Sequence, residues 1–356
     1  MKRVFFLVSL ILGLLLFLFT GQQAGVDDVL KTISLFPIQI IIAVFLINLI
    51  AVAIIGSLRW KLILESQGVY DVSFLKVLRA KLAGFMVSYL TPSVLVGGEP
   101  VRAYMIKERS NCGWEKSFAS VAIDQAIYFL TIFLFMIIGF LFLVGYSSPP
   151  VEILCGFGAL IVFVLFTSYI FYSKTLNRNS GEDGFFMFFI KTIRLDKIKF
   201  IKAIEKNIDT TEKIVACFFK KERGVFLKAF ALSILEILLY LAVIWIIIFY
   251  LNPIIKITQA TSIFSLLTLA NFIPIPGSLG SFEMTLTFIF DFFGFGKSNG
   301  FSFSLIYRII NIAIVFLGFS TLIYFELKTI SHHFSERAPK PLLKIHRFLA
   351  RVLCKK

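Results

Sequence analysis

The chain alternates between long apolar runs and shorter polar stretches that are mostly basic. A helix needs about 20 residues, with a range of about 17–25, to cross the hydrocarbon core of a bilayer. Six runs of suitable length occupy residues 4–20, 38–58, 117–145, 151–173, 225–250 and 301–327. Because a helix satisfies its own backbone hydrogen bonds in lipid, the pattern predicts an all-α polytopic membrane protein with six or more transmembrane helices.

Composition agrees with this class. Of the 356 residues, 58% are hydrophobic and 43 are Phe, which leaves too few polar side chains to coat a soluble domain. The first run follows Lys2 and Arg3, as a signal peptide would, but it is longer than the usual apolar core of about 7–15 residues. We therefore expect this run to be retained as the first span.

The formal net charge of +15 is distributed unevenly along the chain. Lys and Arg gather in residues 2–3, 59–116, 174–228 and 328–356. The positive-inside rule places these regions in the cytoplasm, which predicts a multi-pass protein of the cell membrane with both termini inside. Nucleic-acid binding is the competing explanation, but the basic residues lie where this topology needs them, so we expect no nucleic-acid partner.

Two of the basic regions are predicted to form distinct cytoplasmic segments. Residues 174–224 carry apolar side chains at helical spacing between Lys and Glu, which predicts a cytoplasmic amphipathic linker. Residues 329–356 form a basic cytoplasmic tail.

A broken apolar segment follows the second span. Residues 82–96 are apolar but too short to cross the bilayer, and basic residues flank the segment on both sides. Pro92 should end a descending helix, and Gly97 and Gly98 should let the backbone turn. The pattern predicts a re-entrant loop that places Glu99 and Arg102 on one helix face at the mouth of a cavity.

Residues 258–294 repeat this design. An apolar stretch leads into Pro274 and Pro276, and Gly277, Gly280 and Glu283 follow before a new apolar run. Each half of the chain therefore reads as span, span, broken segment, span, with the first half starting inside and the second outside. That order predicts an inverted-topology repeat with halves 1–146 and 151–328, a plan common among transporters.

The two broken segments resemble motifs of one membrane family. They read PSVLVGGEPVR, which ends at Arg102, and PIPGSLGSFE, which ends at Glu283. Both are similar to motifs in the transmembrane (flippase) region of lysylphosphatidylglycerol synthetase and in stand-alone proteins built from that region. The likeness covers roughly residues 1–328. Ser278 replaces a glycine of the usual second motif, and Glu99 stands where relatives carry Asp or Glu.

The resemblance implies lipid translocation by a flippase-like transmembrane domain. In the family, aminoacyl transfer belongs to a separate soluble domain. No such domain follows residue 328 in this sequence, so we expect neither synthetase activity nor another lipid-modifying enzyme activity.

Several ionisable residues interrupt the predicted spans. A charge at mid-membrane costs about 2.5–3.5 kcal/mol on insertion scales, so such residues usually serve a pathway or a buried ion pair. Asp124, Glu236 and Arg308 lie within spans. We expect them to line a hydrophilic lipid pathway together with Glu99, Arg102 and Glu283. Trp60 and Trp114, near span ends, are expected to be interfacial anchors.

Two functions fit these features. The first is a flippase or scramblase for a phospholipid or a lipid-linked headgroup, and the second is an ion-coupled transporter of an anionic or polyisoprenoid-linked solute. Scattered Cys and His residues predict no metal site, and the sequence has no Walker or dinucleotide-binding motif, so we expect no cofactor. Membrane phospholipids are the expected partners. A separate lipid-modifying enzyme and a homodimer stay open.

Overall fold

The computed structural model describes residues 2–91, 97–146, 149–177, 184–192, 199–271, 273 and 275–337, and every regular element within these ranges is a helix. Six helical spans of this part of the chain are long and apolar enough to cross a membrane. They are α1 (Lys2–Ala24), α3 (Ile38–Leu49) continued by η1 (Ile50–Ile55) and α4 (Gly56–Ser66), α7 (Trp114–Tyr146), α8 (Val151–Phe171), α11 (Arg223–Leu251) and α14 (Lys297–Arg337). The prediction of an all-α polytopic membrane protein is confirmed.

The second span is longer than the apolar pattern indicated. Its helix continues through the π-helical η1 to Ser66. Arg59 and Trp60 therefore lie within the helical rod, and both are fully buried. π-helical turns inside α-helices often occur at functional sites, and here Val52 of η1 lines the cavity described below.

Two pairs of shorter helices lie between the spans. The first hairpin comprises α5 (Phe74–Leu90) and α6 (Glu99–Lys107). The two helices approach so closely that a Cβ added to Gly98 would lie 1.9 Å from the carbonyl oxygen of Gly84. Gly97 also has a φ of +148°, which favours glycine. Pro92, the predicted helix breaker, lies outside the described residues.

The second hairpin comprises α12 (Ile257–Ala270), the 3-10 turn η4 (Pro276–Ser278) and α13 (Ser281–Phe292). Pro276 begins the 3-10 turn, and Gly277 (φ +60°) and Gly280 (φ +79°) supply the left-handed backbone that reverses the chain. A Cβ on Gly280 would lie 2.2 Å from the carbonyl oxygen of Gly13 in α1, so glycine is also needed for this contact. Pro274 lies outside the described residues.

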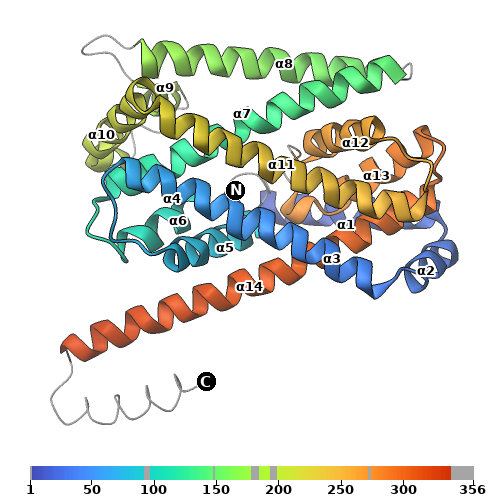
Figure 1. The fold of residues 1–356 in the computed structure, drawn as a ribbon, viewed down its shortest axis with the longest axis horizontal. Coiled ribbons are helices and arrows are strands. Elements are labelled where there is room, and N and C mark those ends of the chain that lie inside the picture. The colour runs from blue at the N-terminus through green and yellow to red at the C-terminus, as the bar shows by residue number, and fades with distance from the viewer. Residues whose placement is uncertain are drawn as a thin grey trace.

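The hairpins pack reciprocally across the bundle (Figure 1). Helix α5 of the first hairpin runs along α14, where a Cβ on Gly318 would lie 2.4 Å from the carbonyl oxygen of Leu82. Helix α12 of the second hairpin runs along α7, where a Cβ on Gly139 would lie 2.3 Å from the carbonyl oxygen of Thr261. Each hairpin thus packs against a long span that is distant in sequence, α14 for the first hairpin and α7 for the second, while α11 packs against α3, η1 and α4.

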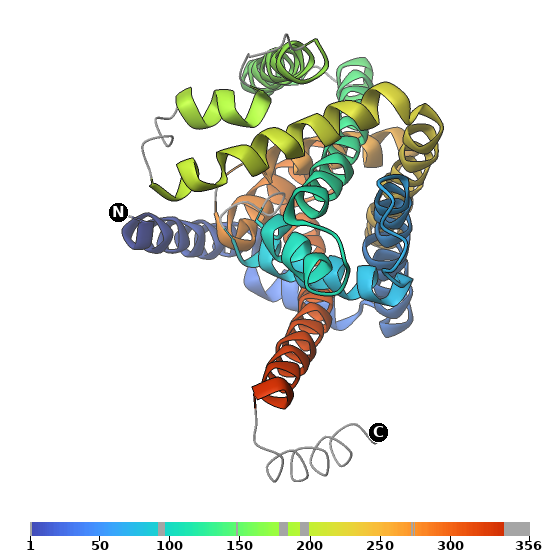
Figure 2. The ribbon, with the colours of Figure 1, turned by 90° about the vertical axis from the view of Figure 1, so that its left-hand side faces the viewer.

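The remaining helices complete the outside of the bundle. Helix α8 lies at its edge and contacts α7 through Phe157 and Phe140, whose ring centroids are 4.4 Å apart. The linker between α8 and α11 contains η2 (Tyr172–Leu176), α9 (Phe185–Thr192) and α10 (Lys199–Lys221), while α2 (Val26–Ser34) joins α1 to α3. Figure 2 shows α14 running out of the bundle toward the C-terminus.

The amphipathic helix predicted in the linker is present as α10. Its buried residues Val215 and Phe218 pack in one cluster with Ile63 of α4 and Ala119 of α7. This part of the apolar face therefore packs on the protein. The Glu212 carboxylate accepts hydrogen bonds from the backbone N–H groups of Phe186 and Met187, which connects α10 to α9.

Candidate functional site

A cavity of about 200 Å³ lies between the two hairpins. Helices α5, α6, α7, α11, α12 and α14 contribute to its wall, together with η1, η4 and α13. Its charged lining residues are Lys81, Glu99, Arg102, Glu236 and Arg308. Aromatic and aliphatic side chains form most of the remaining wall, including Tyr89, Tyr128, Tyr240, Tyr307, Phe264 and Phe303. The site is thus a mainly apolar chamber with a few convergent charges, as in many ligand sites.

One group of charges, the Asp124 cluster, lies beside the first hairpin. It consists of Arg59, Lys81, Arg102, Asp124 and Glu236. Asp124 is fully buried and binds three cations. Its Oδ1 accepts a 2.7 Å hydrogen bond from Arg59 Nε, and its Oδ2 accepts bonds from Lys81 Nζ at 2.9 Å and from Arg102 Nη2. Arg59 Nη1 also donates to Glu236, which joins α4, α5, α6, α7 and α11 in one network.

Aromatic rings support both arginines of this cluster. The guanidinium of Arg102 lies 4.3 Å from the ring centroid of Trp60, and that of Arg59 lies 5.2 Å from the ring centroid of Tyr128. Trp60 Nε1 donates a 3.1 Å hydrogen bond to Ser120 Oγ. The prediction that Trp60 anchors the protein at the membrane interface is therefore wrong, because its ring is buried beneath a buried cation.

Glu99 and Arg102, predicted to share one helix face, have different partners. Its Oε2 accepts a 2.6 Å hydrogen bond from the backbone N–H of Gly97, just before α6 begins. The next amide, that of Gly98, donates to Ser88 Oγ of α5 at 2.8 Å. Glu99 thus caps the turn into α6 and lines the cavity at the same time, while Arg102 pairs with Asp124.

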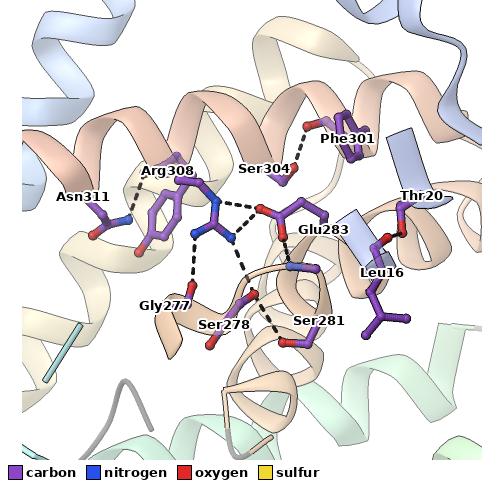
Figure 3. A network of polar contacts seen from close by, with 12 residues as sticks. Leu16, Thr20, Gly277, Ser278, Ser281, Glu283, Phe301, Ser304, Arg308 and Asn311 are labelled. Carbon is purple, nitrogen blue, oxygen red and sulfur yellow. Dashed lines mark hydrogen bonds and ion pairs between the residues drawn. The ribbon is translucent and has the colours of Figure 1, made fainter. Parts of the chain in front are cut away.

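A second group, the Arg308 cluster, lies at the second hairpin (Figure 3). It consists of Arg308, Glu283, Tyr89, Gly277 and Ser278. Arg308 Nε donates to Glu283 Oε1 at 2.7 Å, and Nη2 reaches the same oxygen. The remaining acceptors of the guanidinium are the carbonyl oxygen of Gly277 at 3.0 Å, Tyr89 OH at 3.3 Å and the carbonyl oxygen of Ser278 at 3.5 Å.

Glu283 fixes this arginine to the turn of the second hairpin. It is fully buried, and its Oε2 accepts a 2.7 Å hydrogen bond from the backbone N–H of Gly280. Glu283 thereby repeats the cap that Glu99 makes in the first hairpin, where a carboxylate oxygen binds an amide of the preceding turn. The sequence motif of each hairpin therefore encodes a similar local contact, from Glu99 to the amide two residues before it and from Glu283 to the amide three residues before it.

The structure brings the predicted site residues into one region. Glu99, Arg102, Glu236 and Arg308 line the cavity, whereas Asp124 and Glu283 are buried partners of its two arginines. Sequence reasoning missed Arg59, Lys81 and Tyr89. The available signal for Arg59 was its place directly after a long apolar run. Lys81 was counted with the basic flank of the first broken segment.

The charges of the two clusters and Glu99 balance. The cations are Arg59, Lys81, Arg102 and Arg308, and the anions are Glu99, Asp124, Glu236 and Glu283. Such pairing lowers the cost of keeping ionised groups away from water. Among the described residues, no group of three or more His, Cys, Asp or Glu side chains is placed to hold a metal ion.

The sequence is similar to those of several archaeal membrane proteins. A UPF0104 membrane protein of Methanocaldococcus jannaschii is 23% identical over 85% of this chain and 90% of its own length. A UPF0104 membrane protein of Methanothermobacter thermautotrophicus is 24% identical over 84% of this chain and 88% of its own length. The UPF0104 membrane protein of Pyrococcus horikoshii is 29% identical, but the match spans only 44% of this chain and 46% of that protein.

No solved structure matches the chain. The family match, in contrast, spans most of the sequence, because residues 6–318 match the family described as the lysylphosphatidylglycerol synthase transmembrane region. That range contains both hairpins, the cavity between them and all eight charged residues of the site. The chain therefore belongs to the lysylphosphatidylglycerol synthase transmembrane-region family, which its two hairpin motifs had indicated.

Proposed function

We propose that this protein translocates the headgroup of a phospholipid or a lipid-linked molecule across the cell membrane. The observation that carries the proposal is the cavity itself. It places Lys81 and Arg102 of the first hairpin opposite Arg308 of α14, which is bound to the second hairpin, inside a bundle of helices long enough to span a membrane. A headgroup loses its hydration on entering hydrocarbon, and fixed charges in a cavity replace part of that hydration.

The size of the cavity supports a compact passenger. Its volume of about 200 Å³ is below the about 300–1,000 Å³ of sites that enclose a drug-sized ligand. A headgroup matches this volume, whereas a whole lipid does not. In the proposal the acyl chains stay in the surrounding bilayer while the headgroup passes between the hairpins.

An inverted-topology repeat is part of the same proposal. Each hairpin packs against the last span of the opposite half, through Gly318 on one side and Gly139 on the other. This reciprocal packing is expected if two similar halves interlock with opposite orientations. The hairpins would then be re-entrant, the first from the cytoplasm and the second from outside. Relative movement of the halves would open the cavity to one side at a time.

Lipid movement is tested with the purified chain in liposomes that contain a fluorescent phospholipid analogue. Dithionite reduces only outer-leaflet dye, so a translocating protein increases the fraction that is quenched. We expect activity in the wild type and its loss in Arg102→Gln. Arg79→Gln is the matched control, because Arg79 lies on α5 but stacks on Tyr324 rather than lining the cavity. No protein-dependent quenching in the wild type would remove the proposal.

The same liposomes examine the alternative function. Uptake of an anionic solute that depends on a pH gradient, without lipid movement, would support an ion-coupled transporter. Formation of a new product from labelled lipid would indicate an enzyme, which our proposal excludes.

The proposed orientation has its own test. In a variant with all four native cysteines changed to Ser, Lys297→Cys lies at the first residue of α14 and Lys116→Cys lies in the first turn of α7, both at exposed positions. A membrane-impermeant thiol reagent should label position 297 on intact cells and position 116 only after permeabilisation. The reverse pattern would contradict cytoplasmic termini.

A further inference from the structure

The two arginines that line the cavity differ in how fully they are bound. Arg308 donates to four acceptor atoms, from Glu283, Tyr89, Gly277 and Ser278. Arg102 donates only to Asp124 among the described residues, and its buried Nε has no hydrogen-bond partner there. A buried donor without a partner is unusual and costs free energy. Arg102 of the first hairpin therefore has donor capacity that Arg308, on α14 beside the second hairpin, does not.

Lys81 adds to this capacity. It lies on α5, lines the cavity and retains 12% exposure of its side chain. Its ammonium has three N–H groups, and Asp124 is its only partner among the described residues. Lys81 and Arg102 bind the same carboxylate oxygen, Asp124 Oδ2. Their charges therefore converge on one point at the wall of the cavity.

Lys81 and Arg102 together form an anion site, which Asp124 Oδ2 occupies in this structure. Asp124 Oδ1 accepts a hydrogen bond from Arg59, and Arg59 is also bound to Glu236. A ligand therefore needs to displace only Oδ2 from Lys81 and Arg102, and these other bonds can remain. Phosphoryl oxygens form strong charge-assisted hydrogen bonds with guanidinium and ammonium groups. A tetrahedral phosphate also presents several acceptors, which suits the unused donors of Lys81 and Arg102.

We propose that Lys81 and Arg102 form a phosphate subsite at the first hairpin, where a phosphoryl group competes with Asp124 Oδ2. Arg308, on α14 beside the second hairpin, would not bind the phosphate, because its donors are already occupied. Assigning this phosphate to a transported headgroup rests on the function proposed above. The subsite itself requires only a phosphoryl anion, from a lipid or from a soluble compound.

Binding is measured by calorimetry on the full chain in a maltoside detergent, so that the detergent itself contributes no phosphate. The probes are inorganic phosphate, glycerol phosphate and dihexanoyl phosphatidylglycerol, with phosphate-free dihexanoylglycerol as the reference. We expect saturable binding of at least one phosphate probe. Lys81→Gln should weaken it at least about tenfold, as for the loss of a charge-assisted hydrogen bond, whereas Lys81→Arg should retain most of the affinity.

The matched control is Lys76→Gln, on the same helix. Lys76 Nζ donates to the carbonyl oxygens of Asp71 and Arg109, outside the cavity, so this variant should bind like the wild type. If Lys81→Gln does not fold, Arg102→Lys takes its place. It keeps the charge but loses the guanidinium fork, and it should weaken binding by a similar factor.

The outcomes separate the two proposals. Absence of saturable phosphate binding, or equal affinities for wild type and Lys81→Gln, would overturn the subsite. Preference for the short-chain lipid identifies a headgroup as the source, and equal binding of inorganic phosphate identifies a soluble ligand. Both results uphold the subsite. Phosphate binding without lipid movement in liposomes would remove the proposed translocation and leave the subsite in place.

Discussion

Asp124 offers the sharpest test of how the site is held together. Its carboxylate is the shared partner of Arg59, Lys81 and Arg102, and it is fully buried. Asp124→Asn keeps the shape of the side chain and the acceptor for one cation. The new amide N–H₂ would face the remaining cations donor to donor, and the negative charge would be lost.

The expected loss of stability is large. Removing one partner of a buried ion pair costs about 3–5 kcal/mol, because the other charge stays buried without compensation. Here three cations lose one shared anion, and Glu236 remains to compensate Arg59 alone. We therefore expect the upper part of that range, which corresponds to a fall in melting temperature on the order of 10 °C.

The assay measures thermal unfolding of the purified chain in detergent. Samples are heated to a series of temperatures, and the folded protein that remains is quantified by size-exclusion chromatography with fluorescence detection. The matched control is Asp291→Asn, because Asp291 is exposed and lies 3.8 Å from Lys297. Exposed ion pairs contribute little to stability, so this variant should melt with the wild type. Equal melting of Asp124→Asn and the wild type would refute the reasoning, since it would mean that the cations do not depend on this carboxylate.

Two further variants probe the second hairpin and the packing between the halves. Arg308→Lys should lower both melting temperature and lipid movement, because one ammonium cannot reach all the acceptors of a guanidinium fork. Arg109→Lys should leave lipid movement unchanged, because Arg109 contacts the carbonyl oxygen and the ring of Phe325 and does not line the cavity. Gly139→Ala should destabilise the protein by about 1–3 kcal/mol, since its Cβ would lie 2.1 Å from Ser265 Oγ, and thermal unfolding would detect this. Gly145→Ala, on the same helix, is the control, because a Cβ added to Gly145 would have no atom within 4 Å. An equal effect of the two substitutions would contradict close packing at Gly139.

Features that depend on neighbours along the chain could be predicted from the sequence. Apolar runs of bilayer length determine where spanning helices form, whatever packs around them. The proline and glycine motifs likewise indicated where the hairpins turn, and positive φ at Gly277 and Gly280 shows why glycine stands there. Glu99 and Glu283 cap the turns directly before them, which is again a local contact.

Partners across the site were decided by the tertiary structure alone. Arg59 lies 65 residues from Asp124 and 177 from Glu236. No local pattern distinguishes a cation that faces the cytoplasm from one that turns into the bundle, because both follow an apolar run. Packing made the difference, since α4 lies against α7 and α11 and carries Arg59 and Trp60 inward. The sequence therefore determined which charges interrupt the apolar runs, such as Asp124, Glu236 and Arg308. The fold determined which cations at the ends of these runs turn inward, which charges neutralise one another and which donors stay free.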